Sequence, residues 1–529
     1  MREARTRMSH PTDTGKALEM IRIIGSMTSS PHWSGERART LLLVHPPQHG
    51  LLEGFTAGLV SLANYTATHA PEIEVRLLDL GLETVSGVKE RLELALRETD
   101  APHWVGISTT TATYQSALTV ARIARAIDPS VRIVLGGHHV NAQDDVVLRH
   151  HVGTVDVVAR GEAERSLVRV VRGEDAETIP GISFLRDGRL QRNPPADLLE
   201  PSELDEIPVS FHGGGIRSAP GKFDHATYVS ARGCPLGCHF CAVARQKVRA
   251  KTVEAVIRDL RELVHGWGFR EIAIEDNFFA QSRQRTLAIA EGIRASGLEF
   301  SWDCQTRVES CSPEIVRALK GASCEAVYLG VEALNPEQLG YLGKTSKPDR
   351  YLRQLRDQVV PDLVRHGLGA YLNLQIGLPE EGADVVRRTV AELAHLGTIA
   401  RAHGHQVTVF PQLHVLYPGT QHFMIGLEKR WFGPLHTEVF EHFTEWESHQ
   451  EPVLRWLGRH FAHGTGGIPL GILDRRALEQ GTFRVEPDRI FHVSDYLSRL
   501  EEIDGVRVFR YGKYLADADA SVASTSMTA

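Results

Sequence analysis

Three of the six cysteines in this 529-residue chain lie in one short segment, Arg-Gly-Cys-Pro-Leu-Gly-Cys-His-Phe-Cys, which spans residues 232–241. Cys234, Cys238 and Cys241 have the spacing Cys-x3-Cys-x2-Cys. One tight loop with this spacing can direct three thiolates at three corners of a [4Fe–4S] cube, because thiolates are the usual ligands of such clusters. The fourth iron would lack a protein ligand, and an open metal position is where a small molecule can coordinate.

A zinc site is the alternative that the residues leave open. It would use the same three cysteines with His239 or a distant histidine, although His239 and Cys241 are poorly spaced to bind one ion. The other three cysteines, Cys304, Cys311 and Cys324, share no such spacing. We predict that they are small buried apolar side chains, with a second cluster as the alternative.

The cysteine segment follows the first strand of a β/α repeat. Strands are predicted over residues 228–231, 271–275, 299–304, 325–331, 370–376 and 407–416. Helical patterns between them cover residues 252–267, 285–295, 313–320, 351–365 and 385–396. About six β/α units favour a partial TIM-type (β/α)6 barrel over residues 226–420, with its chemistry at the carboxyl ends of the strands.

An earlier α/β alternation, over residues 39–170, predicts a separate doubly wound, Rossmann-like domain. Strands are expected over residues 40–44, 74–78, 104–108 and 132–135, and helices over residues 117–126 and 144–150. Ligands of such domains bind beyond the carboxyl ends of the parallel strands. The loops expected there, residues 108–111 and 136–139, are rich in hydroxyl groups and glycine.

The remaining segments show weaker patterns. Residues 1–38 and 516–529 are predicted tails, residues 171–225 a linker with few regular elements, and residues 421–515 a mostly helical extension that could cover the site. A net charge of −7 gives no global positive field for nucleic acid. No apolar run approaches the ~18 residues of a membrane span, and the cysteine usage and the lack of a signal sequence predict a cytoplasmic location.

The motif Cys234-x3-Cys238-x-Phe240-Cys241, placed after the first strand of a β/α repeat, resembles that of the radical S-adenosylmethionine superfamily. The resemblance implies that the open iron binds the amino and carboxylate groups of S-adenosylmethionine. It also implies contacts to this cofactor at successive strand ends, from Phe240, Glu275 or Asp276, Arg307, Glu332 and Gly377. A surface ion pair or turn is the alternative for each of these residues taken alone.

The first domain resembles the cobalamin-binding domain that accompanies some radical barrels. The resemblance rests on the segments Val44-His45-Pro46-Pro47, Val105-Gly106-Ile107-Ser108, Val134-Leu135-Gly136-Gly137-His138, Arg160-Gly161-Glu162-Ala163-Glu164 and Ile179-Pro180-Gly181-Ile182. With the barrel, it covers residues 40–420. The implied cobalamin contacts are Ser108, Thr109, Thr110, Gly136 and Gly137.

One departure concerns the axial ligand of cobalt. The Asp-x-His-x-x-Gly pattern of many cobalamin proteins is absent, and His45 and His49 are wrongly spaced to replace its histidine. The lower face of cobalt is therefore undefined. A Rossmann-like domain without a ligand is the alternative.

Together the resemblances imply a cobalamin-dependent enzyme of the class B radical methyltransferase type. A flavodoxin or ferredoxin would reduce the cluster, S-adenosylmethionine would yield a 5′-deoxyadenosyl radical, and methylcobalamin would methylate an unactivated carbon of a small-molecule or natural-product intermediate. Two alternatives stay open: a rearrangement, oxidation or cyclisation with the same cofactors, and a non-enzymatic zinc-binding α/β protein. No catalytic residue is assigned beyond the cluster ligands.

Overall fold

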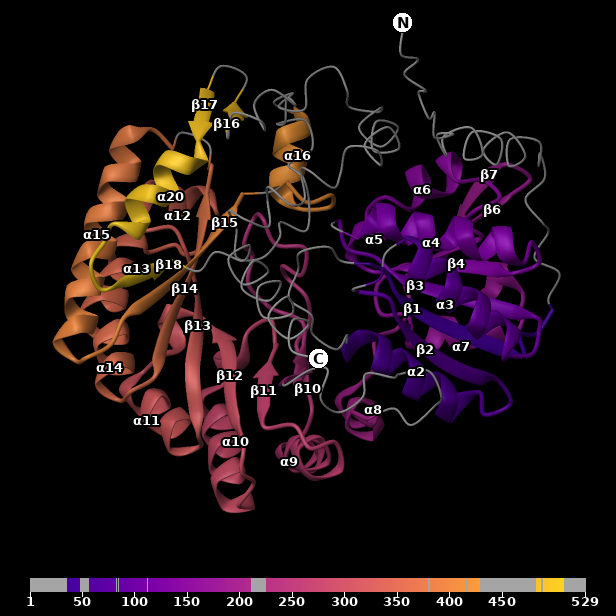
Figure 1. The fold of residues 1–529 in the computed structure, drawn as a ribbon, viewed down its shortest axis with the longest axis horizontal. Helices are drawn as coiled ribbons and strands as arrows, with labels where there is room; N and C mark the ends of the chain where they lie inside the picture. Colours follow the sequence, from indigo (N-terminus) through magenta and orange to yellow (C-terminus); the bar gives the residue numbers. More distant parts are fainter. Residues whose placement is uncertain are drawn as a thin grey trace, which may run out of the picture.

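The computed structural model describes residues 36–47, 57–210, 225–428 and 482–508, except residues 82, 84, 112, 379, 380, 415, 487 and 488. Two α/β domains lie side by side (Figure 1). The predicted tails fall almost entirely outside the described residues, as does much of the predicted extension 421–515. No helix within the described ranges is both long and apolar enough to cross a membrane.

The first domain has a seven-stranded sheet in the order β2-β1-β3-β4-β5-β6-β7. Five strands are parallel: β1 (Thr40–His45), β2 (Glu74–Asp79), β3 (His103–Ser108), β4 (Arg132–Gly136) and β5 (Val157–Ala159). Its helices are α2 (Ala57–His69), α3 (Val85–Arg97), α4 (Tyr114–Ile127), α5 (His138–Asn141), α6 (Asp144–His150) and α7 (Glu164–Val171). The predicted parallel alternation is confirmed.

Both faces of this sheet are covered. Along β1, Leu41 and Leu43 belong to one hydrophobic cluster, and Leu42 and Val44 belong to another. Successive side chains of a strand point to opposite faces, so a strand with apolar residues at every position must be buried on both sides. This continuous apolar run is the reason that β1 occupies an interior position of the sheet, between β2 and β3.

The predicted linker differs from the structure. Residues 182–192 form an antiparallel hairpin, β6 (Ile182–Arg186) and β7 (Arg189–Arg192), which extends the first sheet. Asp187 and Gly188 at its turn have φ values of 50° and 71°, as a two-residue hairpin turn requires. The expectation of few regular elements was therefore wrong here, and the first domain continues to Arg192.

The second domain has a seven-stranded parallel sheet in the order β18-β15-β14-β13-β12-β11-β8. Its strands are β8 (His225–Tyr228), β11 (Glu271–Ile274), β12 (Ser301–Thr306), β13 (Cys324–Glu332), β14 (Gly369–Ile376), β15 (Val407–Leu413) and β18 (Val506–Val508). Five of them, β11 to β15, match predicted strands, whereas β8 lies three residues before the predicted strand 228–231 and shares only Tyr228 with it. The seventh, β18, pairs in parallel with β15 and was not predicted, so part of the predicted extension belongs to the barrel.

Helices follow the strands of this open barrel (Figure 1). They are α9 (Val253–Arg261), α10 (Arg283–Ser296), α11 (Pro313–Gly321), α12 (Pro336–Tyr341), α13 (Pro348–Gln354), α14 (Val360–Arg365), α15 (Ala383–Ala402), α16 (Gln421–Glu428) and α20 (Val493–Glu501). Two short antiparallel pairs of strands lie outside the two large sheets. They are β9 (Ala231–Arg232) with β10 (Arg249–Ala250), and β16 (Thr482–Glu486) with β17 (Arg489–His492).

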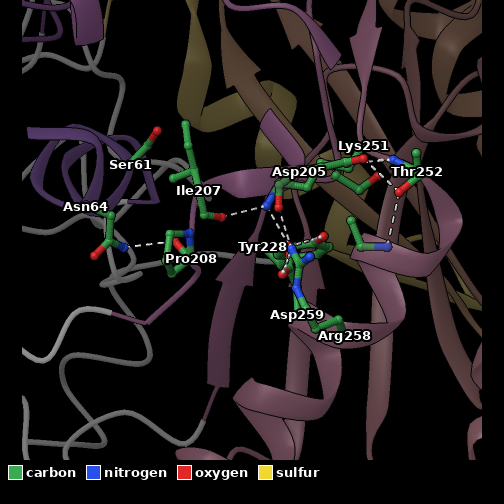
Figure 2. Close-up of polar contacts among 12 residues, drawn as sticks. Ser61, Asn64, Asp205, Ile207, Pro208, Tyr228, Lys251, Thr252, Arg258 and Asp259 are labelled. Carbon is green, nitrogen blue, oxygen red and sulfur yellow. Dashed lines mark hydrogen bonds and ion pairs between the residues drawn. The ribbon is translucent and has the colours of Figure 1, made fainter. Parts of the chain in front are cut away.

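The rest of the linker connects the two domains through polar contacts. After α8 (Pro201–Glu206), the backbone oxygen of Pro208 accepts a 2.8 Å hydrogen bond from the side chain of Asn64 on α2. The neighbouring oxygen of Ile207 accepts one of 3.1 Å from the Lys251 Nζ of the barrel. Figure 2 shows both contacts, with Lys251 also donating to Asp259 at 2.6 Å. The linker is thus fixed to α2 on one side and to the barrel on the other.

Gly137, just after β4, provides a test of how tightly the backbone of the first domain is packed against Thr109. Gly137 has a φ of 110°, and a Cβ added there would overlap the backbone of Thr109. We expect Gly137→Ala to lower the free energy of unfolding by about 3 kcal/mol, because backbone strain and overlap add. Urea unfolding followed by circular dichroism measures this.

Gly153→Ala is the matched control for this substitution. Gly153 also has a positive φ, 79°, but no atom lies within 4 Å of an added Cβ. Only the backbone strain applies there, so we expect a loss of about 1 kcal/mol. Equal losses for the two variants would contradict the packing that we describe.

Candidate functional site

The cysteine loop begins just after β8 and is closed by its own backbone. Gly233 has a φ of 86° and lies against the Lys247 carbonyl, where a side chain would not fit. The backbone NH of Gln246 donates to the Cys234 oxygen at 2.8 Å, and that of Cys241 donates to the Cys238 oxygen at 3.2 Å. Backbone hydrogen bonds therefore fold the segment that carries the three cysteines back on itself.

The electrostatics of these thiols favour a bound cation. All three are free, with Cys234 buried and the other two half-buried. Burial, and then the charges of Cys238 and Cys234, raise the pKa of the Cys241 thiol to about 11. Deprotonation of these thiols would therefore need a nearby positive charge, which the irons of a bound cluster would supply. Arg307 contributes further, because its Nη1 lies 3.5 Å from the Cys238 sulfur.

The zinc alternative requires a fourth ligand. His239 instead has its Nδ1 at 2.9 Å from the carbonyl oxygen of Tyr341. Within the described residues, no group of three or more His, Cys, Asp or Glu side chains could hold a single metal ion. All thiolates of a zinc site approach one ion to about 2.3 Å, whereas those of a cluster each bind a different iron.

The resemblance did not decide between Glu275 and Asp276, and the structure gives these two neighbouring acids different surroundings. Asp276 is 1% exposed and accepts three hydrogen bonds: from the Ser230 NH at 2.6 Å, the Ser230 hydroxyl at 2.6 Å and the Ala231 NH at 2.9 Å. It therefore holds the segment that leads into the cysteine loop. Glu275 instead lines a cavity, and burial by the surrounding protein raises the pKa of its carboxyl.

Glu332 and Arg307 both contact the buried Lys344, the first through its side chain and the second through its backbone oxygen. Glu332 has a φ of 71°, at a register shift between β13 and β14, and is 9% exposed. Its carboxylate accepts hydrogen bonds from Lys344 Nζ at 3.2 Å and Gln375 Nε2 at 3.0 Å. Arg307 donates to the Lys344 backbone oxygen and to Glu309. A strained, buried carboxylate is typical of a functional position.

Lys344, Gln375 and His414 join this group and were not predicted as site residues. His414 Nδ1 is 2.6 Å from Gln375 Oε1, and Gln375 in turn donates to Glu332. Because the Gln375 amide must direct its NH2 at the carboxylate, its oxygen faces His414, which must donate from Nδ1. Gln375 lies two residues before Gly377 in the sequence, but nothing in that segment indicated its contacts with Glu332 and His414.

The remaining predicted contacts of S-adenosylmethionine lie near the same end of the barrel. Phe240 is half-buried and packs against the main hydrophobic cluster of the second domain. Gly377 follows β14 with a φ of 76°, and its NH donates to the Glu381 carboxylate. The loop after β14 is thereby fixed at the barrel mouth, where the cysteines also lie.

A cavity of about 650 Å³ lies between the two domains. Its lining from the first domain includes Gly106, Ser108, Gly136, Gly137, His138 and Gly161. Its lining from the barrel includes Ser230, Ala231, Arg232, Gly233, Glu275 and Asn277. The cavity thus reaches from the carboxyl ends of β3 and β4 to the segment just before Cys234. Backbone without side chains at Gly136 and Gly137 suits close approach of a large flat ligand.

The two predicted threonines have supporting positions instead. Thr109 is 1% exposed, and its hydroxyl donates to the Gly136 oxygen at 2.8 Å. Thr110 and Thr113 are joined through their hydroxyls at 3.1 Å. Neither Thr109 nor Thr110 lines the cavity. These threonines order the loop beside Gly136, while Ser108 faces the cavity.

Of the two histidines near the end of β1, His45 and His49, the structure describes only His45. His45 ends β1 and is 8% exposed, with its Nδ1 at 3.0 Å from the Asp79 carboxylate. It does not line the cavity. His49 lies outside the described residues.

The three remaining cysteines are placed as predicted. Cys304, Cys311 and Cys324 are each 0% exposed and belong to the hydrophobic cluster of the second domain. A hydrogen bond with Cys324, together with burial, raises the pKa of the Cys304 thiol, and burial raises the pKa of the Cys311 thiol to about 12, so both thiols are neutral at ordinary pH. Their prediction as small buried side chains is confirmed.

Two family models match the chain. The B12 binding domain matches residues 51–171, and the Radical SAM superfamily matches residues 228–409. The first match covers the glycine-rich edge of the cavity, and the second covers the cysteine loop and the strand ends around it. The first match begins inside the predicted domain 39–170 and ends one residue beyond it, and the second lies within residues 226–420.

Curated relatives are similar to more than half of the chain. An uncharacterized methyltransferase of Pyrococcus horikoshii is 29% identical over 368 residues, which cover 66% of this chain and 76% of the relative. The anaerobic magnesium-protoporphyrin IX monomethyl ester cyclase of Cereibacter sphaeroides is 25% identical over 315 residues, 55% of this chain and 48% of the relative. The chain therefore spans only about half of the cyclase.

A solved structure shows the same fold. The radical S-adenosylmethionine methyltransferase TsrM of Kitasatospora setae, with tryptophan and an S-adenosylmethionine analogue bound, has a TM-score of 0.61 and 17% identity. The likeness covers 74% of this chain and 77% of TsrM. With both domain matches, the chain belongs to the cobalamin-dependent radical S-adenosylmethionine enzymes, whose cofactors are cobalamin, S-adenosylmethionine and a [4Fe–4S] cluster.

Proposed function

We propose that this enzyme transfers a methyl group to an unactivated carbon of a small molecule or natural-product intermediate. The observation that carries the proposal is the shared cavity: Gly136 and Gly137 of the first domain line it together with Ser230 to Gly233, which lead directly into Cys234. One cofactor held at each end of this cavity would face the other across it. Methyl transfer between two cofactors needs such proximity.

In this proposal the chain's residues hold and orient the cofactors. Cys234, Cys238 and Cys241 bind the cluster, Glu275 binds the ammonium group of S-adenosylmethionine, and Arg307 binds its carboxylate. Glu332, with Lys344 and Gln375, supports the neighbouring wall. When bound, the reduced cluster supplies the electron that cleaves S-adenosylmethionine to a 5′-deoxyadenosyl radical, and the corrinoid supplies the methyl group.

The first domain has the complementary task. Ser108, Gly136 and Gly137 line the cavity on its side and would contact the corrinoid directly, while Thr109 keeps the Gly136 backbone in place. We further propose a cytoplasmic setting with a flavodoxin or ferredoxin as electron donor, since free cysteines and a reducible cluster both suit a reducing compartment.

A second candidate reaction is cyclisation or another rearrangement without methyl transfer. The similarity to the magnesium-protoporphyrin IX monomethyl ester cyclase favours it, because that relative is named for ring closure. The similarity to the Pyrococcus horikoshii methyltransferase favours methylation over a larger share of the chain. Deuterium-labelled S-adenosylmethionine separates the two: a product heavier by the labelled methyl group supports methylation, and an unlabelled product supports the second candidate.

The cluster assignment is tested by anaerobic reconstitution. We expect wild-type protein to bind about four irons per chain and to release 5′-deoxyadenosine from S-adenosylmethionine with a low-potential reductant. Cys238→Ala removes one of the three cluster ligands, so 5′-deoxyadenosine should fall at least a hundredfold while cobalamin uptake is unchanged. Cys311→Ala, at a buried cysteine outside the loop, is the control and should retain the cluster. Full activity of Cys238→Ala would overturn the assignment.

The two acids after β11 should respond differently to substitution. Glu275→Gln removes a cavity-facing charge, so we expect the Kd of S-adenosylmethionine to rise about tenfold, or ~1.4 kcal/mol, with normal iron content. Asp276→Asn replaces one of the two carboxylate oxygens that order Ser230 and Ala231 with a donor. We therefore expect reduced iron content and a lower Tm. Iron analysis and equilibrium dialysis distinguish the variants, and an exchange of these phenotypes would contradict the assigned roles.

A further inference from the structure

A cluster of opposite charges joins the first domain to the barrel at the wall of the cavity. We call it the interdomain ion-pair cluster; its members are Glu162 and Glu164 from the first domain, Arg232 and Arg249 from the barrel, and the hydroxyl of Ser61 on α2. All five residues line the cavity. None of them was assigned a role by the cofactor contacts described above.

Glu162 is the centre of this cluster. Its Oε2 accepts hydrogen bonds from Arg249 Nη1 at 2.8 Å and from Arg232 Nη1 at 3.0 Å, and its Oε1 accepts a third from Arg249 Nη2. Arg249 also donates to the Leu199 backbone oxygen at 2.9 Å. One carboxylate of the first domain thus fixes two guanidinium groups of the barrel, with the directional geometry of a bidentate pair.

Arg232 carries this connection to the cysteine loop. Its Nη2 donates to the Ser61 hydroxyl at 2.7 Å and lies 2.8 Å from Glu164 Oε1. The Ser61 hydroxyl donates to the same oxygen of Glu164 at 2.9 Å. Only Gly233 separates Arg232 from Cys234 in the sequence. Arg232 therefore links Ser61 and Glu164 of the first domain to the barrel segment that leads into Cys234.

Because these charged side chains are largely buried, removing one partner would destabilise the folded protein. The side chain of Arg249 is 1% exposed and that of Glu164 is 5% exposed. Burial opposes ionisation of Glu162, but hydrogen bonds and charges from Arg249 and Arg232 hold the pKa of its carboxyl below the usual value. Neutralising Glu162 would leave Arg249 as a buried charge without its main partner, a change that is strongly unfavourable.

From this geometry we infer that Glu162 is a positioning residue that sets the separation between the cofactor of the first domain and the cofactor of the barrel. The inference rests on the proposed function. It predicts that the ion-pair cluster matters for the step that crosses the cavity, and matters little for the step confined to the barrel. Reductive cleavage of S-adenosylmethionine needs only the cysteine loop and the barrel mouth, so it provides an internal reference.

The step that would cross the cavity is methylation of the corrinoid. When bound and reduced by a low-potential one-electron donor, the corrinoid would supply the electron pair for the new bond to the methyl carbon. The sulfur–methyl bond of S-adenosylmethionine would break with its electron pair left on sulfur, so that S-adenosylhomocysteine would be released. The reaction is a displacement that depends on alignment of the two reacting atoms, and a displacement of about 1 Å lowers such rates by about a hundredfold.

The experiment compares Glu162→Gln with wild type in the fully reconstituted enzyme. We expect S-adenosylhomocysteine release to fall about tenfold, while 5′-deoxyadenosine release stays within twofold and iron and cobalamin contents are unchanged. A second readout does not depend on turnover: relaxation of the cob(II)alamin electron paramagnetic resonance signal by the reduced cluster, which depends on their separation. It should differ measurably between Glu162→Gln and wild type.

Two further variants make the result decisive. Glu174→Gln removes an ion pair with Arg169 on the outer surface of the same domain, 2.6 Å in length, and should leave both products unchanged. Ser61→Ala removes only the hydroxyl between Arg232 and Glu164, and should lower S-adenosylhomocysteine release two- to threefold. It serves as the test if Glu162→Gln does not accumulate as folded protein.

The outcomes separate this inference from the proposed function. Unchanged product ratios and unchanged relaxation in Glu162→Gln and Ser61→Ala would overturn the positioning role, as would an equal fall of both products with loss of cofactor. If wild-type enzyme with both cofactors releases neither product, the proposed function fails and the inference fails with it. A selective loss of S-adenosylhomocysteine with altered relaxation supports the inference.

Discussion

The arrangement of the site depends on one buried carboxylate, that of Asp276. It accepts hydrogen bonds from the backbone and hydroxyl of Ser230 and from the backbone of Ala231, where the chain leaves the edge strand β8. These amides donate to the carboxylate where the chain passes from β8 to the short strand β9, and a buried amide without a partner would destabilise the fold by about 1–3 kcal/mol. Because this turn is fixed, Arg232 meets the first domain and Cys234 begins the cluster loop.

Much of the architecture could be predicted because parallel sheets buried on both faces require continuous apolar strands separated by helices. This pattern located β1 to β4 and five of the seven barrel strands, β11 to β15. It failed for β18, whose Val506–Val508 is too short to show a pattern and is placed by pairing with β15, about a hundred residues earlier. The hairpin of β6 and β7 was missed although Asp187-Gly188 is a recognised hairpin turn.

The chemistry of the site could be predicted where it is local in sequence. The cysteine spacing lies within one loop, and the glycines at 136 and 137 lie within one turn. The roles of Glu275 and Asp276 could not be separated, because which of two adjacent side chains faces inward depends on how the strand end is fixed. Lys344, Gln375 and His414 come from three different segments, and only the fold shows that Lys344 and Gln375 contact Glu332 and that His414 contacts Gln375.

Within the described residues, the contact between the two domains combines one apolar attachment with ion pairs and hydrogen bonds. The described hydrophobic clusters each belong to one domain, and the linker crosses between them: Ile207 is buried with the first domain, and Val209 packs against the barrel. The linker therefore supplies a lasting apolar attachment at one point. Elsewhere at the cavity wall, ion pairs and hydrogen bonds join the domains. Because Glu162 holds Arg249 and Arg232 with directional hydrogen bonds, this contact favours one relative position of the two domains, which an apolar surface would fix less specifically.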